Sequence, residues 1–71
     1  MITIYGQAGC SFCAKAVDLC KARNASYEYK DISSDVNRRE FKKNFPKATT
    51  VPQIMIDGLF IGGYSDLLKE L

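Results

Sequence analysis

Histidine and tryptophan are both absent from the 71 residues of this chain. The lack of histidine excludes Ser-His-Asp and Cys-His catalysis, histidine metal ligation and histidine-based pH sensing. No apolar run approaches the roughly 20 residues that a membrane-spanning helix needs. The first residues show neither the basic nor the apolar region of a signal peptide, so we expect neither secretion nor membrane attachment.

Apolar residues nevertheless make up 46% of the chain, with four Phe and four Tyr among them. This content is enough to build a hydrophobic core and excludes an intrinsically disordered chain. The length allows one small domain, so we expect residues 1–71 to form a single unit of modest stability.

The basic residues are concentrated in one segment. The net charge is +2, but residues 36–47 contain five cations and one acid, Glu40: Arg38, Arg39, Lys42, Lys43 and Lys47. Such a segment is typical of a solvated helix face, or of a patch that attracts a small anion or an acidic partner. Nucleic-acid binding is the alternative, and because no nucleic-acid motif accompanies the charges we do not expect it.

Hydrophobic periodicity and turn residues predict seven elements. In chain order they are a strand over 2–5, a helix over 11–23, a strand over 27–32, a helix over 36–45, strands over 51–56 and 59–61, and a helix over 66–71. The first strand–helix–strand unit predicts parallel strands, and Asp57-Gly58 predicts an antiparallel hairpin. We therefore expect an α/β fold with a four-stranded mixed sheet flanked by helices.

Local patterns specify how these elements pack. The helix over 11–23 carries an apolar stripe that we expect to face the core, formed by Phe12, Cys13, Ala16, Val17, Leu19 and Cys20. Phe41 and Phe45 lie four residues apart and face the core from the second helix. Ser65 is the predicted cap of the last helix.

Cys10 and Cys13 form a C-x-x-C at the start of the first predicted helix. Free backbone N–H groups and the positive end of the helix dipole stabilise a thiolate there and lower its pKa. Cys13 lies one turn further along, close enough to attack a mixed disulfide on Cys10. The spacing therefore predicts a dithiol redox centre in which Cys10 attacks and Cys13 resolves.

Other roles for the cysteines stay open. The C-x-x-C is also half of a structural zinc site, but such sites use four Cys or His ligands and this chain offers only one further cysteine, Cys20. We interpret Cys20 as a small apolar core residue, with a secondary redox or regulatory thiol as the alternative. Three cysteines without a signal peptide indicate a reducing compartment, the cytoplasm.

Three motifs together carry a family resemblance. They are Cys10-Ser11-Phe12-Cys13, Thr50-Val51-Pro52-Gln53-Ile54 and Gly62-Gly63-Tyr64-Ser65-Asp66-Leu67. In this order and spacing, the chain resembles a short dithiol glutaredoxin over essentially its whole length. The resemblance implies a thioredoxin-like fold and glutathione-dependent thiol-disulfide exchange.

The resemblance also implies a glutathione site. The Val51–Pro52 bond would be cis and would turn the Val51 backbone toward Cys10, where it pairs with the cysteinyl part of glutathione. The complete set that the resemblance implies is Phe12, Arg39, Thr50, Val51, Pro52, Gly63, Tyr64, Ser65 and Asp66.

Each end of glutathione has an implied partner. Ser65 would bind the γ-glutamyl carboxylate and Asp66 its ammonium group, while Arg38 or Arg39 would meet the glycyl carboxylate. The alternative is that Gly62-Gly63 is only a turn and Ser65 only a helix cap.

Two positions depart from the usual family pattern. Gln7 replaces a lysine that many members carry, and Ser11 replaces the proline of C-P-Y-C. Some members with C-S-Y-C bind a [2Fe–2S] cluster between two subunits, using the first cysteine and glutathione. A cluster-binding carrier or sensor is therefore the second class of function.

The resemblance implies an enzyme, a monomeric thiol-disulfide oxidoreductase that uses glutathione as its reductant. Its substrates would be protein disulfides, protein–glutathione mixed disulfides or a ribonucleotide reductase. A redoxin reduced by thioredoxin reductase is a third possibility, which the Gly62-Gly63-Tyr64-Ser65-Asp66 segment argues against.

Overall fold

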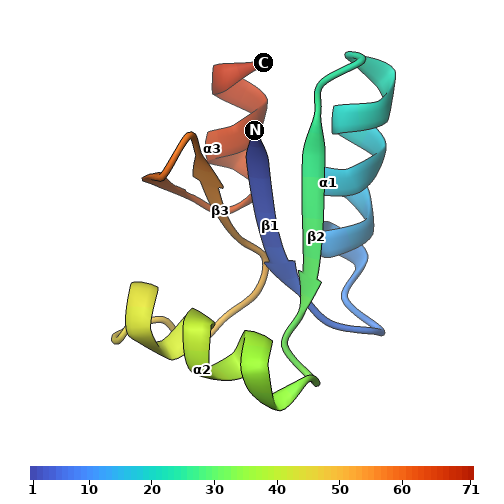
Figure 1. The fold of residues 1–71 in the computed structure, drawn as a ribbon. Helices are drawn as coiled ribbons and strands as arrows, with labels where there is room; N and C mark the ends of the chain where they lie inside the picture. Colours follow the sequence, from blue (N-terminus) through green and yellow to red (C-terminus); the bar gives the residue numbers. More distant parts are fainter.

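The computed structural model describes residues 1–71 and contains four strands and three helices (Figure 1). In chain order these are β1 (Ile2–Gly6), α1 (Ser11–Ala22), β2 (Tyr27–Asp31), α2 (Asp35–Asn44), β3 (Gln53–Ile56), β4 (Leu59–Gly62) and α3 (Tyr64–Glu70). The predicted α/β class and the predicted order of elements are confirmed.

The strands form one mixed sheet in the order β2-β1-β3-β4. β1 runs parallel to β2 and antiparallel to β3, so the predicted βαβ unit is present. β3 and β4 form the predicted hairpin, in which Asp57 and Gly58 take positive φ values of 50° and 82°. Because β1 and β3 are adjacent and antiparallel, the segment that follows β1 and the segment that precedes β3 lie side by side at the same end of the sheet.

Hydrophobic clusters cover both faces of the sheet. Ile4 and Tyr5 are neighbours in β1 and therefore point to opposite faces. One cluster packs the sheet against α1 and α3 and contains Ile2, Ile4, Ala16, Cys20, Ile54 and Leu67. The other joins Tyr5 to α2 through Phe41 and Phe45, as predicted for these two aromatics. Figure 1 shows α2 near the end of the sheet at which β1 and β2 terminate.

The last helix begins earlier than predicted. α3 starts at Tyr64 with Gly63 as its N-cap, so Ser65 lies inside the helix and does not cap it. The carboxylate of Asp66 instead accepts a hydrogen bond of 3.1 Å from the Gly63 N–H, as acidic residues at this position often do. A side chain on Gly62, whose φ is 117°, would place Cβ 2.3 Å from Asp66 Oδ2. Glycine is therefore required for this close turn.

Two further expectations were wrong. Phe12 is 53% exposed and does not join the buried stripe of α1, because in the first turn it packs against Tyr64 of α3, with ring centroids 5.8 Å apart. The third strand begins at Gln53, which pairs with Tyr5, and not at Val51. Pro52 has no N–H to donate to a strand ladder, so residues 51–52 form a loop before β3.

The basic segment lies on α2 and the turn that follows it. Arg38 pairs with Asp35 at 2.6 Å, while Arg39, Lys42 and Lys43 are exposed. This arrangement is the solvated helix face that the sequence predicted. None of the three helices has the length and apolar composition required to cross a membrane.

Candidate active site

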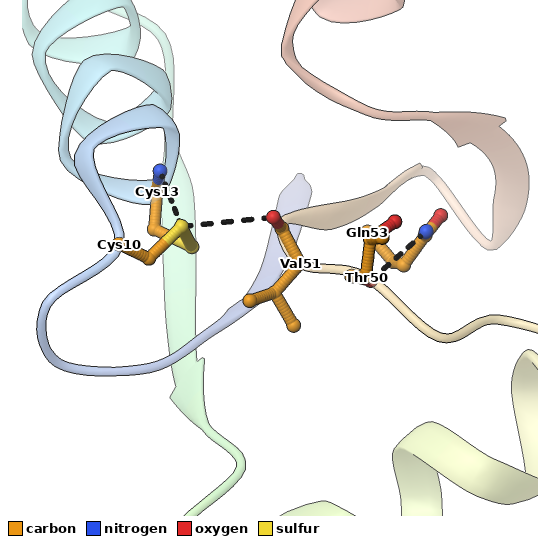
Figure 2. The surroundings of a disulfide bond; sticks show 5 residues. All are labelled: Cys10, Cys13, Thr50, Val51 and Gln53. Atoms are coloured by element: carbon orange, nitrogen blue, oxygen red, sulfur yellow. Dashed lines mark hydrogen bonds between the residues drawn. A yellow bond between two sulfur atoms is a disulfide. The ribbon is translucent and has the colours of Figure 1, made fainter.

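Cys10 occupies the N-cap of α1, as the sequence predicted. Its backbone is extended, with φ −99° and ψ 106°, and its Sγ accepts a 3.1 Å hydrogen bond from the Cys13 N–H (Figure 2). A sulfur at this position receives a backbone donor and faces the positive end of the helix dipole. Both interactions favour the thiolate over the thiol when the pair is reduced.

The two cysteines form a disulfide in this structure, with Cα atoms 5.2 Å apart. Their accessibility differs. Cys13 is only 1% exposed, whereas Cys10 is partly accessible to solvent. An external thiol or disulfide can therefore reach Cys10 but not Cys13.

The loop before β3 lies directly beside Cys10. The Val51–Pro52 bond is cis, as the resemblance implied, and the Val51 carbonyl oxygen lies 3.6 Å from Cys10 Sγ (Figure 2). The side-chain amide of Gln53 donates a 3.1 Å hydrogen bond to the Thr50 carbonyl, which braces the same loop (Figure 2).

A groove of about 340 Å³, here called the proline groove, brings together most of the implied glutathione residues. Seven of the nine line it, together with Gln53: Phe12, Thr50, Val51, Pro52, Gly63, Tyr64 and Ser65. They come from the first turn of α1, the loop before β3 and the turn into α3.

A second groove continues from this one toward α2. This helix-side groove has a volume of about 410 Å³ and shares Thr50 and Val51 with the proline groove. Its remaining lining residues are Gln7, Cys10, Ile32, Phe41, Ala48 and Thr49. Cys10 lines the helix-side groove, and Val51, whose carbonyl oxygen is 3.6 Å from Cys10 Sγ, lines both grooves.

Two implied glutathione residues are not among those lining either groove. Arg39 is exposed on α2, and neighbouring Arg38 is paired with Asp35. Asp66 lies in the first turn of α3, where one carboxylate oxygen accepts a hydrogen bond from the Gly63 N–H.

Sequence reasoning missed a third groove, which follows the other side of the redox pair. This tyrosine groove has a volume of about 420 Å³ and is lined by both cysteines and by Gln7, Ala8, Gly9, Ala14, Val17, Asp18, Tyr27 and Tyr29. The alternation of Tyr27 and Tyr29 in a strand predicted to lie beside the first one was the available signal.

Cys20 lies in the core, completely buried between α1 and the sheet. Burial raises the pKa of its thiol, which makes it a poor nucleophile and agrees with the predicted apolar role. No group of three or more Cys, Asp or Glu side chains is placed to hold a metal ion, so the C-x-x-C is not completed to a zinc site within this chain.

Known proteins are similar to this chain in both sequence and fold. The Glutaredoxin family profile matches residues 2–61. The chain belongs to the glutaredoxin family. Glutaredoxin 1 of Rickettsia prowazekii is 38% identical over 70 residues, which cover 96% of this chain and 74% of that protein.

Solved glutaredoxin structures show the same fold. Reduced Escherichia coli glutaredoxin superimposes with a TM-score of 0.78 at 30% identity, covering 97% of this chain and 89% of that one. A buckwheat glutaredoxin in complex with glutathione has a TM-score of 0.79 and covers 97% of this chain and 66% of that one. Because its sequence identity is only 19%, this structural similarity is evidence for the fold alone.

Family membership makes this chain a thiol-disulfide oxidoreductase of the thioredoxin fold. Its redox-active pair is Cys10 and Cys13, the C-x-x-C at the start of α1. Thiol-disulfide exchange needs an accessible sulfur that is stabilised as a thiolate and a second sulfur within reach. The geometry of the pair meets both requirements.

Proposed function

We propose that this glutaredoxin domain, residues 1–71, uses glutathione to reduce protein disulfides and protein–glutathione mixed disulfides. Cys10 is the nucleophile and Cys13 the resolving thiol. The observation that carries the proposal is the proline groove, in which seven residues implied to bind glutathione converge beside Cys10. Glutathione is also the ligand in the structure of the buckwheat glutaredoxin, which has the same fold.

The reaction with a protein disulfide proceeds in two exchanges. The Cys10 thiolate attacks one substrate sulfur, the substrate S–S bond breaks, and the other substrate sulfur leaves as a thiolate. The Cys13 thiolate then attacks Cys10 and releases the remaining substrate thiolate, which leaves the Cys10–Cys13 disulfide of this structure.

Two glutathione molecules restore the dithiol. The first attacks Cys10 and releases Cys13, and the second attacks the glutathione sulfur on Cys10. The products are glutathione disulfide and the Cys10 thiolate, so the electrons gained by the substrate come from the two glutathione thiols.

The proline groove suits the parts of glutathione that do not react. Val51 offers its backbone next to Cys10 for the cysteinyl residue, and Phe12 and Tyr64 form an apolar wall. Ser65 and Asp66 lie at the turn into α3 for the γ-glutamyl end. Arg38 and Arg39 lie on α2 and line neither groove, and the resemblance assigns the glycyl carboxylate to one of them.

Partner and cofactor expectations follow from the same resemblance. We expect a cytoplasmic monomer whose protein substrates include ribonucleotide reductase. A [2Fe–2S] cluster would draw one ligand, Cys10, from this chain and the others from glutathione and a second subunit. No observation on these residues favours that function over thiol exchange.

Single-cysteine variants test the assignment. Cys10→Ser is expected to abolish all exchange, because it removes the accessible sulfur. Cys13→Ser is expected to stop reduction of protein disulfides but to keep removal of glutathione from mixed disulfides, since external glutathione resolves that intermediate. The matched control is Cys20→Ser, a change to the third cysteine that leaves the redox pair intact.

Both activities are measured by coupling glutathione disulfide formation to glutathione reductase. Mass spectrometry of Cys13→Ser should also trap one glutathione on Cys10. Equal losses for Cys10→Ser and Cys13→Ser in both assays would overturn the division of roles.

A further inference from the structure

A tyrosine hydroxyl and the buried sulfur of the redox pair both lie close to Gly6. A side chain at Gly6 would place its Cβ 2.6 Å from Tyr29 Oη and 2.9 Å from Cys13 Sγ. The φ of Gly6 is not positive, so glycine is needed here for space and not for backbone conformation. The hydroxyl and the sulfur therefore face the same small space beside the Gly6 Cα.

The pairing register of β1 and β2 positions Tyr29 close to Gly6. β2 runs parallel to β1, with Tyr29 opposite Ile4 and Asp31 opposite Gly6. The Tyr29 side chain thus reaches along the sheet toward the end of β1, from which the chain leads to Cys10. Tyr29 and both cysteines line the tyrosine groove.

Cys13 needs a hydrogen-bond donor when the disulfide opens. An attacking thiolate that bonds to Cys10 leaves the electron pair of the S–S bond on Cys13, which becomes a thiolate. Cys13 is 1% exposed, and an unpaired buried anion is costly. The N–H of Cys13 donates its hydrogen bond to Cys10 Sγ. This backbone donor of the helix terminus therefore stabilises Cys10 and not Cys13.

We propose that the Tyr29 hydroxyl donates a hydrogen bond to the Cys13 thiolate whenever that thiolate forms. The inference rests on the proposed role of Cys13 as the resolving thiol. In the disulfide the Cys13 sulfur is uncharged and bonded to Cys10. Breaking that bond frees the sulfur to turn about Cα–Cβ into the space beside Gly6, where the hydroxyl stabilises it without transferring its own proton.

The Tyr29 hydroxyl is protonated and can therefore donate a hydrogen bond. Burial, followed by the nearby Asp31 carboxylate, raises the pKa of Tyr29, so the hydroxyl keeps its proton at neutral pH. The other titratable groups on the tyrosine groove are Cys10, Asp18 and Tyr27. Cys10 is not a donor when it carries the mixed disulfide, and the carboxylate of Asp18 accepts hydrogen bonds.

Tyr29→Phe tests the inference, with Tyr27→Phe as the matched control on the same strand and groove. Both are made in Cys10→Ser protein, and the pKa of Cys13 is read from the pH dependence of its Cβ chemical shift. Loss of a hydrogen bond donated to the thiolate disfavours the charged form of the sulfur and so raises its pKa. Tyr29→Phe is therefore expected to raise the pKa of Cys13 by about one, and Tyr27→Phe to leave it unchanged.

The same variants are compared in protein with both cysteines. A pKa raised by about one leaves roughly tenfold less thiolate at neutral pH but makes each thiolate about threefold more nucleophilic. Reduction of a protein disulfide should therefore slow about threefold, and its pH profile should move to higher pH. Removal of glutathione from mixed disulfides by Cys13→Ser protein should not respond to Tyr29→Phe.

The outcomes separate this inference from the proposed function. If Cys13→Ser retains full reduction of protein disulfides, the resolving role itself is wrong. If Cys13→Ser loses that activity but Tyr29→Phe shifts neither the Cys13 pKa nor the pH profile, only the hydrogen bond is wrong. Equal shifts from Tyr29→Phe and Tyr27→Phe would also overturn it, since they would indicate a general effect of the groove.

Discussion

At the scale of single residues, the two sulfurs of the redox pair have different surroundings. Cys10 receives a backbone N–H at the start of α1 and opens onto two grooves. Cys13 is buried one turn further, beside Gly6 and Tyr29. The difference in access supports the proposed division into an attacking and a resolving sulfur, even though only two residues lie between them.

Asp66 is the residue at which binding of the γ-glutamyl end can be tested. One of its carboxylate oxygens accepts the Gly63 N–H at 3.1 Å, so the negative charge lies at the turn that leads into α3. Asp66→Asn keeps an oxygen for the Gly63 N–H but removes the charge. Hydrogen bonds to charged groups contribute about 1.5–3 kcal/mol, and partial exposure lowers this toward the low end.

We therefore expect Asp66→Asn to raise KM for glutathione mixed disulfides about tenfold, with kcat nearly unchanged because this end of glutathione is far from the reacting sulfurs. Steady-state kinetics give both constants. Glu70→Gln, at the exposed end of α3, is the matched control, and a small disulfide without a γ-glutamyl group should be reduced normally. An unchanged KM would mean that the turn is only structural.

At the scale of elements, a polar network ties α2 to the sheet. The Tyr5 hydroxyl donates to Glu40 at 2.5 Å and accepts from the Asn44 amide at 3.1 Å. Lys30 of β2 forms an ion pair with the same Glu40 carboxylate. This network is next to the cluster of Tyr5, Phe41 and Phe45, so α2 is held by polar and apolar contacts together.

The network predicts a pH dependence of stability. The hydrogen bond from Lys30, followed by that from Tyr5, lowers the pKa of Glu40 from its ordinary 4.5. A lowered folded-state pKa means that the stabilisation is present above pH 4.5 and is lost as the pH falls through the folded-state value. The same Glu40 bond raises the pKa of Lys30, so its contribution is present below the unfolded-state pKa and lost in strong alkali.

Glu40→Gln should therefore lower the free energy of unfolding by about 1 kcal/mol at pH 7, because the carboxylate is partly exposed. Below the folded-state pKa of Glu40, the variant and the parent should converge. Urea denaturation at pH 7 and at a pH below the folded-state pKa of Glu40 measures both free energies of unfolding. Glu28→Gln is the matched control, since Glu28 approaches the same Lys30 from an exposed position at 3.9 Å. A difference that is independent of pH would contradict the electrostatic origin.

At the scale of the whole molecule, one sheet supports two hydrophobic clusters and the active site. The cluster beneath α1 and α3 includes Leu67, which is completely buried. The cluster beneath α2 uses Tyr5 of the central strand β1. Because both clusters contact the same strands, we expect the chain to unfold as one cooperative unit.

Leu67→Ala tests this cooperativity. Removal of a buried leucine side chain typically costs about 2–5 kcal/mol, a large part of the roughly 4–10 kcal/mol expected for a chain of this length. Leu68→Ala, which changes the adjacent and 45% exposed leucine, should cost far less. Denaturation followed by far-ultraviolet circular dichroism and by tyrosine fluorescence should give coincident transitions for each protein. Separate transitions would show that α3 unfolds by itself.

Local patterns were sufficient to predict the fold and the redox pair. Strand alternation, helical periodicity and the Asp57-Gly58 turn depend on neighbours within a few residues, and they predicted all seven elements in order. The C-x-x-C is equally local, because its chemistry requires only a helix start and one helical turn. The errors fell at element ends, where Gly63 and not Ser65 is the N-cap of α3.

Only the tertiary structure decided which distant side chains surround the sulfurs. The order β2-β1-β3-β4 places the loop before β3 and the end of β1 side by side, which brings Val51 to within 3.6 Å of Cys10 Sγ. It also places Tyr29 beside Cys13, at a glycine whose missing side chain leaves the space. Sequence patterns determine the face of a strand on which a residue lies, but contacts beyond a strand's end depend on register and on the space left by neighbours. For this reason the sequence alone predicted the redox pair, and the folded sheet decided which residues surround the two sulfurs.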